Sequence, residues 1–160
     1  RDGSEGYNFR LYSKNLRTGE EKTIVDVTEN FVWTADPHVS WGQYTVYQVD
    51  RSVYVYDMET QTSKKLFTHE PGWDLYNYKI MDGHVIAICG TEDTCRAWAI
   101  DIMDGSVVEL DTYGENVVAF SAHYECNGYF VGLLHASNNA DQYYISKEDF
   151  YRSNYDAAFR

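Results

Sequence analysis

The feature that most constrains this chain is a hairpin that occurs three times at nearly constant spacing. In each copy a strand of β-branched and aromatic residues ends at Asn15, Asp57 or Asp101. An apolar residue follows each of these, and a threonine or aspartate stands three positions on. An Asn or Asp side chain bonds backbone N–H groups two or three residues ahead, so each copy predicts a turn into a returning strand. The copies lie 42 and 44 residues apart.

A second marker repeats with a similar period. Asp82-Gly83 and Asn127-Gly128 favour tight hairpin turns, because such pairs take positive φ at low cost, and they lie 45 residues apart. One hairpin per period is typical of a β-propeller, whose four-stranded blades take about 40–45 residues each. The sequence therefore predicts an all-β fold of β-propeller blades, with about three four-stranded antiparallel repeats that form a partial ring or a fragment of a larger propeller.

The predicted repeats make residues 1–160 a single propeller segment. In chain order they are a half blade at 1–27, a blade at 31–67, a blade at 73–111 and a partial blade at 117–160. Known propellers have at least about four blades, so we expect further blades or another chain to close the ring. The stretch 147–160 departs from the repeat and fits either a short helix capped by Ser146 or a degraded final strand.

Composition and charge limit the class of partner. The chain is 44% hydrophobic and 16% aromatic, with 15 Tyr, which is typical of β-structure and not of disorder. A formal net charge of −12 argues against polyanions such as nucleic acids and anionic lipids. No apolar run reaches the ~18–20 residues that span a bilayer. We therefore expect a protein or peptide partner, no nucleic acid and no membrane span.

The three cysteines leave the redox compartment open. Cys89 and Cys95 flank a short predicted hairpin loop, where two thiols can face each other. One interpretation is a disulfide in an oxidising compartment, which would favour an extracytoplasmic location. The other is two reduced, half-buried thiols. Cys126 has no partner in the sequence, and the spacing of Cys and His does not match a zinc site.

The sequence holds no recognisable catalytic arrangement. No His, Ser and Asp form a nucleophile pattern, and His123, His135 and Glu125 fit turn and strand-end positions better than a metal site. We therefore predict no catalytic residue, no cofactor and no metal. One set of aromatic residues is a candidate ligand surface for a carbohydrate or peptide: Trp41, Tyr76, Tyr78, Tyr143 and Tyr144.

The repeat also carries a family resemblance. The runs Tyr12–Glu20 and Val55–Thr60 share a strand, an Asp or Asn, an apolar residue and a later Thr, and this pattern resembles the WD40-like, TolB-type propeller repeat. A looser resemblance, to the propeller of prolyl oligopeptidase-type serine peptidases, rests on Asp2–Glu5, Leu11–Glu20 and Val32–Asp36. That resemblance implies a propeller that gates a separate hydrolase domain and has no nucleophile of its own. This sequence has no G-x-S-x-G motif.

The leading hypothesis is a non-catalytic β-propeller interaction module that binds a protein or peptide partner, because the repeats combine a rigid scaffold with variable loops. One alternative is a regulatory propeller segment of a larger serine peptidase of the prolyl oligopeptidase type. Another is a surface propeller that binds carbohydrate.

Overall fold

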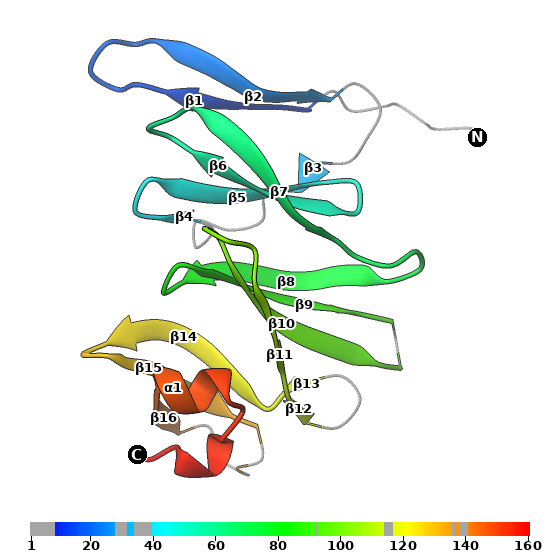
Figure 1. Ribbon diagram of the computed structural model, residues 1–160, viewed down its shortest axis with the longest axis vertical. Coiled ribbons are helices and arrows are strands. Elements are labelled where there is room, and N and C mark those ends of the chain that lie inside the picture. The colour runs from blue at the N-terminus through cyan, green and yellow to red at the C-terminus, as the bar shows by residue number, and fades with distance from the viewer. Residues whose placement is uncertain are drawn as a thin grey trace. The chain divides into compact units, whose positions relative to one another are not determined.

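The computed structural model describes residues 9–27, 32–33, 40–91, 93–113, 117–135, 137 and 141–160 (Figure 1). Regular structure in these ranges is almost entirely antiparallel β-strand, with one short α-helix and one 3₁₀ helix near the C-terminal end. The chain divides into two compact units, Arg1–Thr68 and His69–Arg160. Within the described ranges no helix has the length and apolar character to cross a membrane.

The first unit contains a hairpin and a larger sheet. The hairpin pairs β1 with β2, and the sheet runs in the order β3-β5-β6-β7, with β4 also pairing β5. Side chains of the central strands β5 and β6 form its core, whereas most of β7 is exposed. The strands are β1 (Phe9–Lys14), β2 (Glu21–Val27), β3 (Val32–Trp33), β4 (Ser40–Trp41), β5 (Tyr44–Val49), β6 (Ser52–Asp57) and β7 (Thr62–Thr68).

The second unit contains a four-stranded sheet and a three-stranded sheet, joined by a short strand pair. The orders are β11-β10-β9-β8 and β14-β15-β16, and β12 pairs β13. The elements are β8 (Asp74–Met81), β9 (His84–Gly90), β10 (Cys95–Asp101), β11 (Val107–Leu110), β12 (Thr112–Tyr113), β13 (Val117–Val118), β14 (Phe120–Cys126), β15 (Tyr129–Leu134), β16 (Gln142–Ser146), α1 (Lys147–Tyr151) and η1 (Tyr155–Ala157).

The three repeated hairpins close with the same hydrogen bonds. The side-chain oxygen accepts from the N–H groups two and three residues ahead, at 2.9 and 3.2 Å for Asn15, 2.8 and 3.3 Å for Asp57, and 2.6 and 3.1 Å for Asp101. Glycine takes the left-handed position of the turn in two copies, and Gln61 takes it in the third with φ of 56°. The turn chemistry predicted from the spacing is therefore present in all three copies.

One apolar core joins the two larger sheets of the second unit to α1. Phe130, Ile145 and Phe150 are its most deeply buried large side chains, and the rings of Phe130 and Phe150 meet edge to face with centroids 4.7 Å apart. Burying each such side chain stabilises the fold by about 1.5–3 kcal/mol. This core positions the turns and side chains described below.

The C-terminal stretch contains both of the structures that its sequence allowed. Ser146 caps α1, because its Oγ accepts a hydrogen bond from the Asp149 N–H at 3.1 Å. Beyond η1, Phe159 pairs with Tyr144 through two backbone hydrogen bonds of 2.7 and 2.9 Å. A single residue thus continues the β14–β16 sheet after the helix.

Candidate functional site

The aromatic residues singled out in the sequence do not share one surface. Trp41 is 42% exposed and stacks on Tyr44 with ring centroids 6.3 Å apart. Tyr143 and Tyr144 are consecutive in β16 and therefore project to opposite faces of the sheet. Tyr143 is 8% exposed, whereas Tyr144 is half-buried. The side chains of Tyr76 and Tyr78 lie outside the described part of the chain.

The structure holds Cys89 and Cys95 as free, buried thiols. Their strands pair so that Cys95 lies opposite Gly90 and Cys89 lies opposite Arg96. Cross-strand partners share a face and neighbours along a strand do not, so the two thiols project from opposite faces. The disulfide interpretation is therefore not met in this structure, and the physical reason is the register. Burial raises the pKa of the Cys89 thiol to about 12, so this thiol is poorly reactive.

The set His123, His135 and Glu125 does not form a metal site in the structure. Among the described residues there is no group of three or more His, Cys, Asp or Glu side chains placed to hold a metal ion. Instead, Glu125 accepts a hydrogen bond from the backbone N–H of Asp82 at 2.6 Å. His135 Nε2 lies 2.8 Å from the Ser121 hydroxyl.

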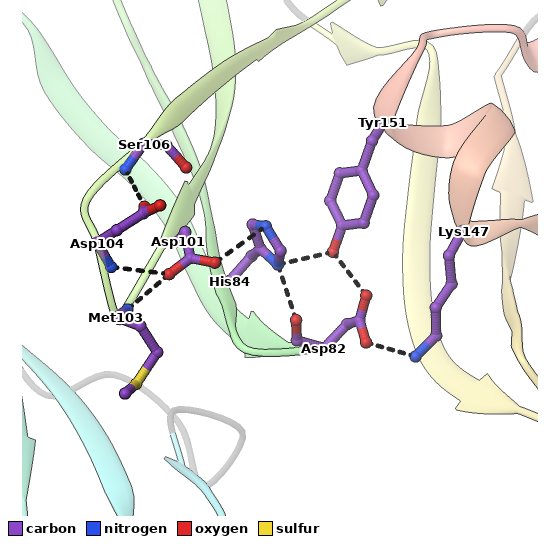
Figure 2. A network of polar contacts seen from close by, with 8 residues as sticks. All are labelled: Asp82, His84, Asp101, Met103, Asp104, Ser106, Lys147 and Tyr151. Carbon is purple, nitrogen blue, oxygen red and sulfur yellow. Dashed lines mark hydrogen bonds and ion pairs between the residues drawn. The ribbon is translucent and has the colours of Figure 1, made fainter.

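A network of charged and polar side chains links the two larger sheets of the second unit. We call it the polar clasp, and it comprises Asp82, His84, Asp101, Glu125, Lys147 and Tyr151. The Lys147 ammonium lies 2.5 Å from Asp82 Oδ1 and 2.7 Å from Glu125 Oε2. Figure 2 shows Lys147 and Tyr151, from α1, pointing toward Asp82 in the β8–β9 turn. The clasp therefore joins that turn, the end of β14 and the helix.

Tyr151 and His84 form the inner part of the clasp (Figure 2). The Tyr151 hydroxyl donates to Asp82 Oδ2 at 3.2 Å and lies 3.1 Å from His84 Nδ1. The same nitrogen lies 2.7 Å from the Asp82 carbonyl oxygen. On the other side of the ring, His84 Nε2 lies 3.8 Å from Asp101 Oδ2.

The protonation states in the clasp favour a structural role. Burial, and then the negative charge of Asp82, raise the pKa of Tyr151 above its ordinary value. Burial opposes the charge of Lys147, but hydrogen bonds to Asp82 and Glu125 outweigh it and raise the pKa of Lys147. Tyr151 is thus a neutral phenol and Lys147 a cation between two carboxylates, and neither is available as a base at neutral pH.

One local pattern in the sequence points to part of the clasp. Ser146 as a helix cap places Lys147 and Tyr151 four residues apart, on one face of α1. The partners of that face, Asp82 and Glu125, lie in turns far away in the chain. No local pattern connects them, so the clasp was missed.

A cavity lies close to the clasp, in the same junction of the second unit. Its volume is about 150 Å³, and its lining residues are Lys79, Ile86, Ile88, Leu110, Phe120, Ser121, Ala122, His123 and Tyr155. The Lys79 ammonium donates a hydrogen bond to the Ala122 carbonyl oxygen. Burial lowers the pKa of Lys79. Burial, followed by the charges of Lys79 and His135, lowers the pKa of His123.

A β-bulge forms the rim of this cavity. Ala122 pairs with Gly132 and Tyr124 pairs with Val131, so His123 is the extra residue of β14. A Cβ atom at Gly132 would overlap the Ser121 carbonyl, so the bulged strand requires glycine opposite it. Bulges re-aim a side chain that would otherwise follow the alternation of the strand.

A groove lies between the β1–β2 and β6–β7 turns of the first unit. It has a volume of about 230 Å³, and Met58 and Gln61 are among its lining residues. Lys22 Nζ crosses between the hairpins and donates to the Gln61 carbonyl at 2.8 Å. Leu16, in the β1–β2 turn, is 93% exposed.

No protein-family model and no curated protein sequence matches the chain. A solved structure does: a chain described as oligogalacturonate lyase in complex with manganese superposes with a TM-score of 0.55 at 14% identity. The match covers 88% of this chain and 40% of that one. The sheets are β-propeller blades. The predicted all-β propeller class is thereby confirmed, and at this identity the likeness concerns the fold alone.

Proposed function

We propose that the chain is a β-propeller interaction module whose hairpin turns bind a protein or peptide partner. The observation that supports this is that each repeated turn exposes one large apolar side chain: Leu16, Met58 and Met103, at 93%, 45% and 68%. In the third copy Ile102 stands at the position of Leu16 and Met58 and is buried, and the next residue, Met103, is exposed instead.

This repetition matters more than the exposure itself. Single exposed apolar residues are normal on protein surfaces, but the same turn carries one in all three copies. Methionine is unbranched and adapts its shape to a partner. The formal net charge of −12 favours a partner that surrounds its apolar contact with basic side chains, since complementary charge speeds association.

The methionines allow a direct test. The chain has three, of which Met58 and Met103 are exposed and Met81 is buried. A peptide selected from a displayed library against the chain should shift the methyl NMR signals of Met58 or Met103 and leave Met81 unchanged. The double substitution Met58→Ser, Met103→Ser should abolish binding, whereas Val107→Ser, an exposed control in β11 outside the turns, should not.

Two results would count against this function. One is a selected peptide whose binding survives the double substitution. The other is turnover of a peptide or ester substrate that a point substitution in this chain abolishes, since the proposal is of a non-catalytic module.

A carbohydrate-binding propeller is the second candidate, and the exposed Trp41–Tyr44 stack favours it. Flat aromatic faces suit sugar rings, and the structural neighbour is described as an oligogalacturonate lyase. Oligogalacturonate and neutral oligosaccharides should then quench tryptophan fluorescence, and Trp41→Ala should remove the effect. The WD40-like assignment and the role in a prolyl oligopeptidase-type peptidase rest on sequence resemblance alone.

A further inference from the structure

The cavity beside β14 has the ammonium of Lys79 and the imidazole of His123 next to apolar residues. We propose that it binds one small organic carboxylate, with the carboxylate group on Lys79 and His123 and the apolar part against Ile86, Ile88 and Phe120. The residues of this site are not those of the exposed turns in the proposed function.

The charges of the junction support an anionic ligand. Among the described residues, none that lines the cavity is acidic and no carboxylate lies within ion-pair distance of Lys79, whose ammonium has the Ala122 carbonyl as its partner. Asp82, in the β8–β9 turn, and Glu125, in β14, come a few residues after Lys79 and His123 in the chain, but both form ion pairs with Lys147. A cation withdrawn from water without a counterion is unfavourable, and a bound carboxylate would supply that counterion.

Size and lining define the rest of the ligand. A cavity of about 150 Å³ accepts a single aromatic ring or a short branched chain, because an engineered apolar cavity of ~150 Å³ takes up benzene. The walls also include isoleucine, leucine and phenylalanine residues, and Ile86 is the cross-strand partner of Lys79. An inorganic anion would leave those walls in contact with water, so an organic acid is the better match.

Hydrogen-bond donors are present at the rim. His123 is exposed and is presented there by the bulge of β14. Ser121 is also among the lining residues, and its hydroxyl lies 2.8 Å from His135 Nε2. When that nitrogen carries the hydrogen, Ser121 accepts from it and can donate to the ligand. Charge-assisted hydrogen bonds of this kind are about twice as strong as neutral ones.

Binding should become weaker as the pH rises. A carboxylate favours the protonated forms of Lys79 and His123, so it raises their pKa values and takes up protons on binding. Among the described residues, the other titratable groups around the site include Tyr155 from η1, Asp111, whose charge acts on Tyr155, and His135, whose charge acts on His123. Substituting Lys79 should flatten the pH dependence above neutral pH.

Benzoate is the probe that tests the site. In the intact chain with labelled methyl groups, benzoate should shift the signals of Ile86, Ile88 and Ala122, and Lys79→Met should weaken binding by roughly tenfold or more, as expected for a lost charged hydrogen bond. The matched control is Lys65→Met, on the exposed strand β7, which should bind as the parent does. Benzyl alcohol, which has the ring without the charge, and inorganic phosphate should both bind at least about tenfold more weakly.

Several outcomes would overturn the proposal. Benzoate that causes no shifts at millimolar concentration, or that binds Lys79→Met as well as the parent, removes the site. Phosphate that binds as tightly as benzoate removes the assignment of an organic acid. If Lys79→Met does not fold, the pKa of Lys79 in the parent chain, followed by NMR of its side-chain carbon, must rise when benzoate saturates the chain, and an unchanged pKa refutes the proposal.

Discussion

Lys147 in the polar clasp and Lys79 in the cavity differ in the groups that surround their ammonium charges. In the polar clasp, Lys147 lies between the carboxylates of Asp82 and Glu125. In the cavity, Lys79 has a backbone carbonyl as its hydrogen-bond partner and apolar walls around it. Both lysines are partly removed from water, so the difference lies in the counterions. In the clasp, the charge of Lys147 is balanced by carboxylates, and this suits a contact that stabilises the sheets. In the cavity, the charge of Lys79 has no carboxylate partner among the described residues, and this suits a site that binds an anion.

The largest effect on stability should follow from Gly132→Ala, which disturbs the bulge at the rim of the cavity and leaves the clasp residues unchanged. The added methyl would overlap the Ser121 carbonyl on the bulged strand, and overpacking against backbone costs about 3 kcal/mol. We expect a loss of that size in the free energy of unfolding, measured by urea denaturation, together with loss of benzoate binding.

Gly128→Ala is the control for that substitution. Gly128 has φ of 84° but open space around its Cα, so alanine there should cost only about 1 kcal/mol. Equal losses for the two variants would mean that the bulge at His123 is not held by close packing against Gly132.

The next effect in size should come from Lys147→Met. This change leaves Asp82 and Glu125 facing each other without a cation, with side chains 29% and 30% exposed. Solvent screens groups with this exposure, so we expect a loss of about 1 kcal/mol rather than the larger cost of a buried pair. Urea denaturation measures it, and Lys65→Met, on the exposed face of β7, should change stability little. If Lys147→Met leaves the free energy of unfolding unchanged, the ion pairs of the clasp do not contribute to stability.

Lys79→Met should act in the opposite direction. It removes a charge that burial disfavours and replaces it with an apolar side chain of similar length. We expect unchanged stability or a gain of up to about 1 kcal/mol, because well-packed apolar replacements of buried charges are often neutral or stabilising. A clear loss in the same denaturation assay would mean that the bond to the Ala122 carbonyl outweighs the burial of the charge.

The sequence could predict the hairpins because their chemistry is local. Asn15, Asp57 and Asp101 each cap a turn with their own side chain, and Asp82-Gly83 takes positive φ at both positions. Such features need no partner from another part of the chain. The repeat spacing therefore led correctly to propeller blades.

The functional candidates could not be found in that way, because they depend on register and on contacts between sheets. Of the two interpretations left open for Cys89 and Cys95, the disulfide required residues flanking a loop to share a face, but Cys95 pairs with Gly90, and a shift of one residue reverses the face. His123 reaches the cavity through a bulge that interrupts the alternation of β14. Lys79 and His123 meet across two strands whose pairing partners lie elsewhere, so no spacing in the sequence connects them.

The smallest effect, and the sharpest comparison, is the dependence of stability on pH. The pKa values of Lys147 and Tyr151 are raised in the folded chain. Their contribution is therefore complete below the unfolded values of ~10.4 and ~10 and is lost as the pH rises through the folded values. The pKa of Lys79 is lowered, so its burial destabilises the fold at low pH, and this penalty disappears as the pH approaches ~10.4.

The two lysine variants should consequently diverge from the parent at opposite ends of the pH range. The advantage of Lys79→Met over the parent should be greatest near neutral pH and should shrink toward pH ~10.4, whereas the deficit of Lys147→Met should hold to pH ~10.4 and shrink only above it. Denaturation of the parent and both variants, from neutral to alkaline pH, measures this directly. His123, whose pKa is also lowered, adds a rise in stability only as the pH increases toward ~6.5. If the difference in free energy of unfolding between each variant and the parent did not change with pH, the charges of the two lysines would not have different surroundings. The contrast between the clasp and the cavity would then be wrong.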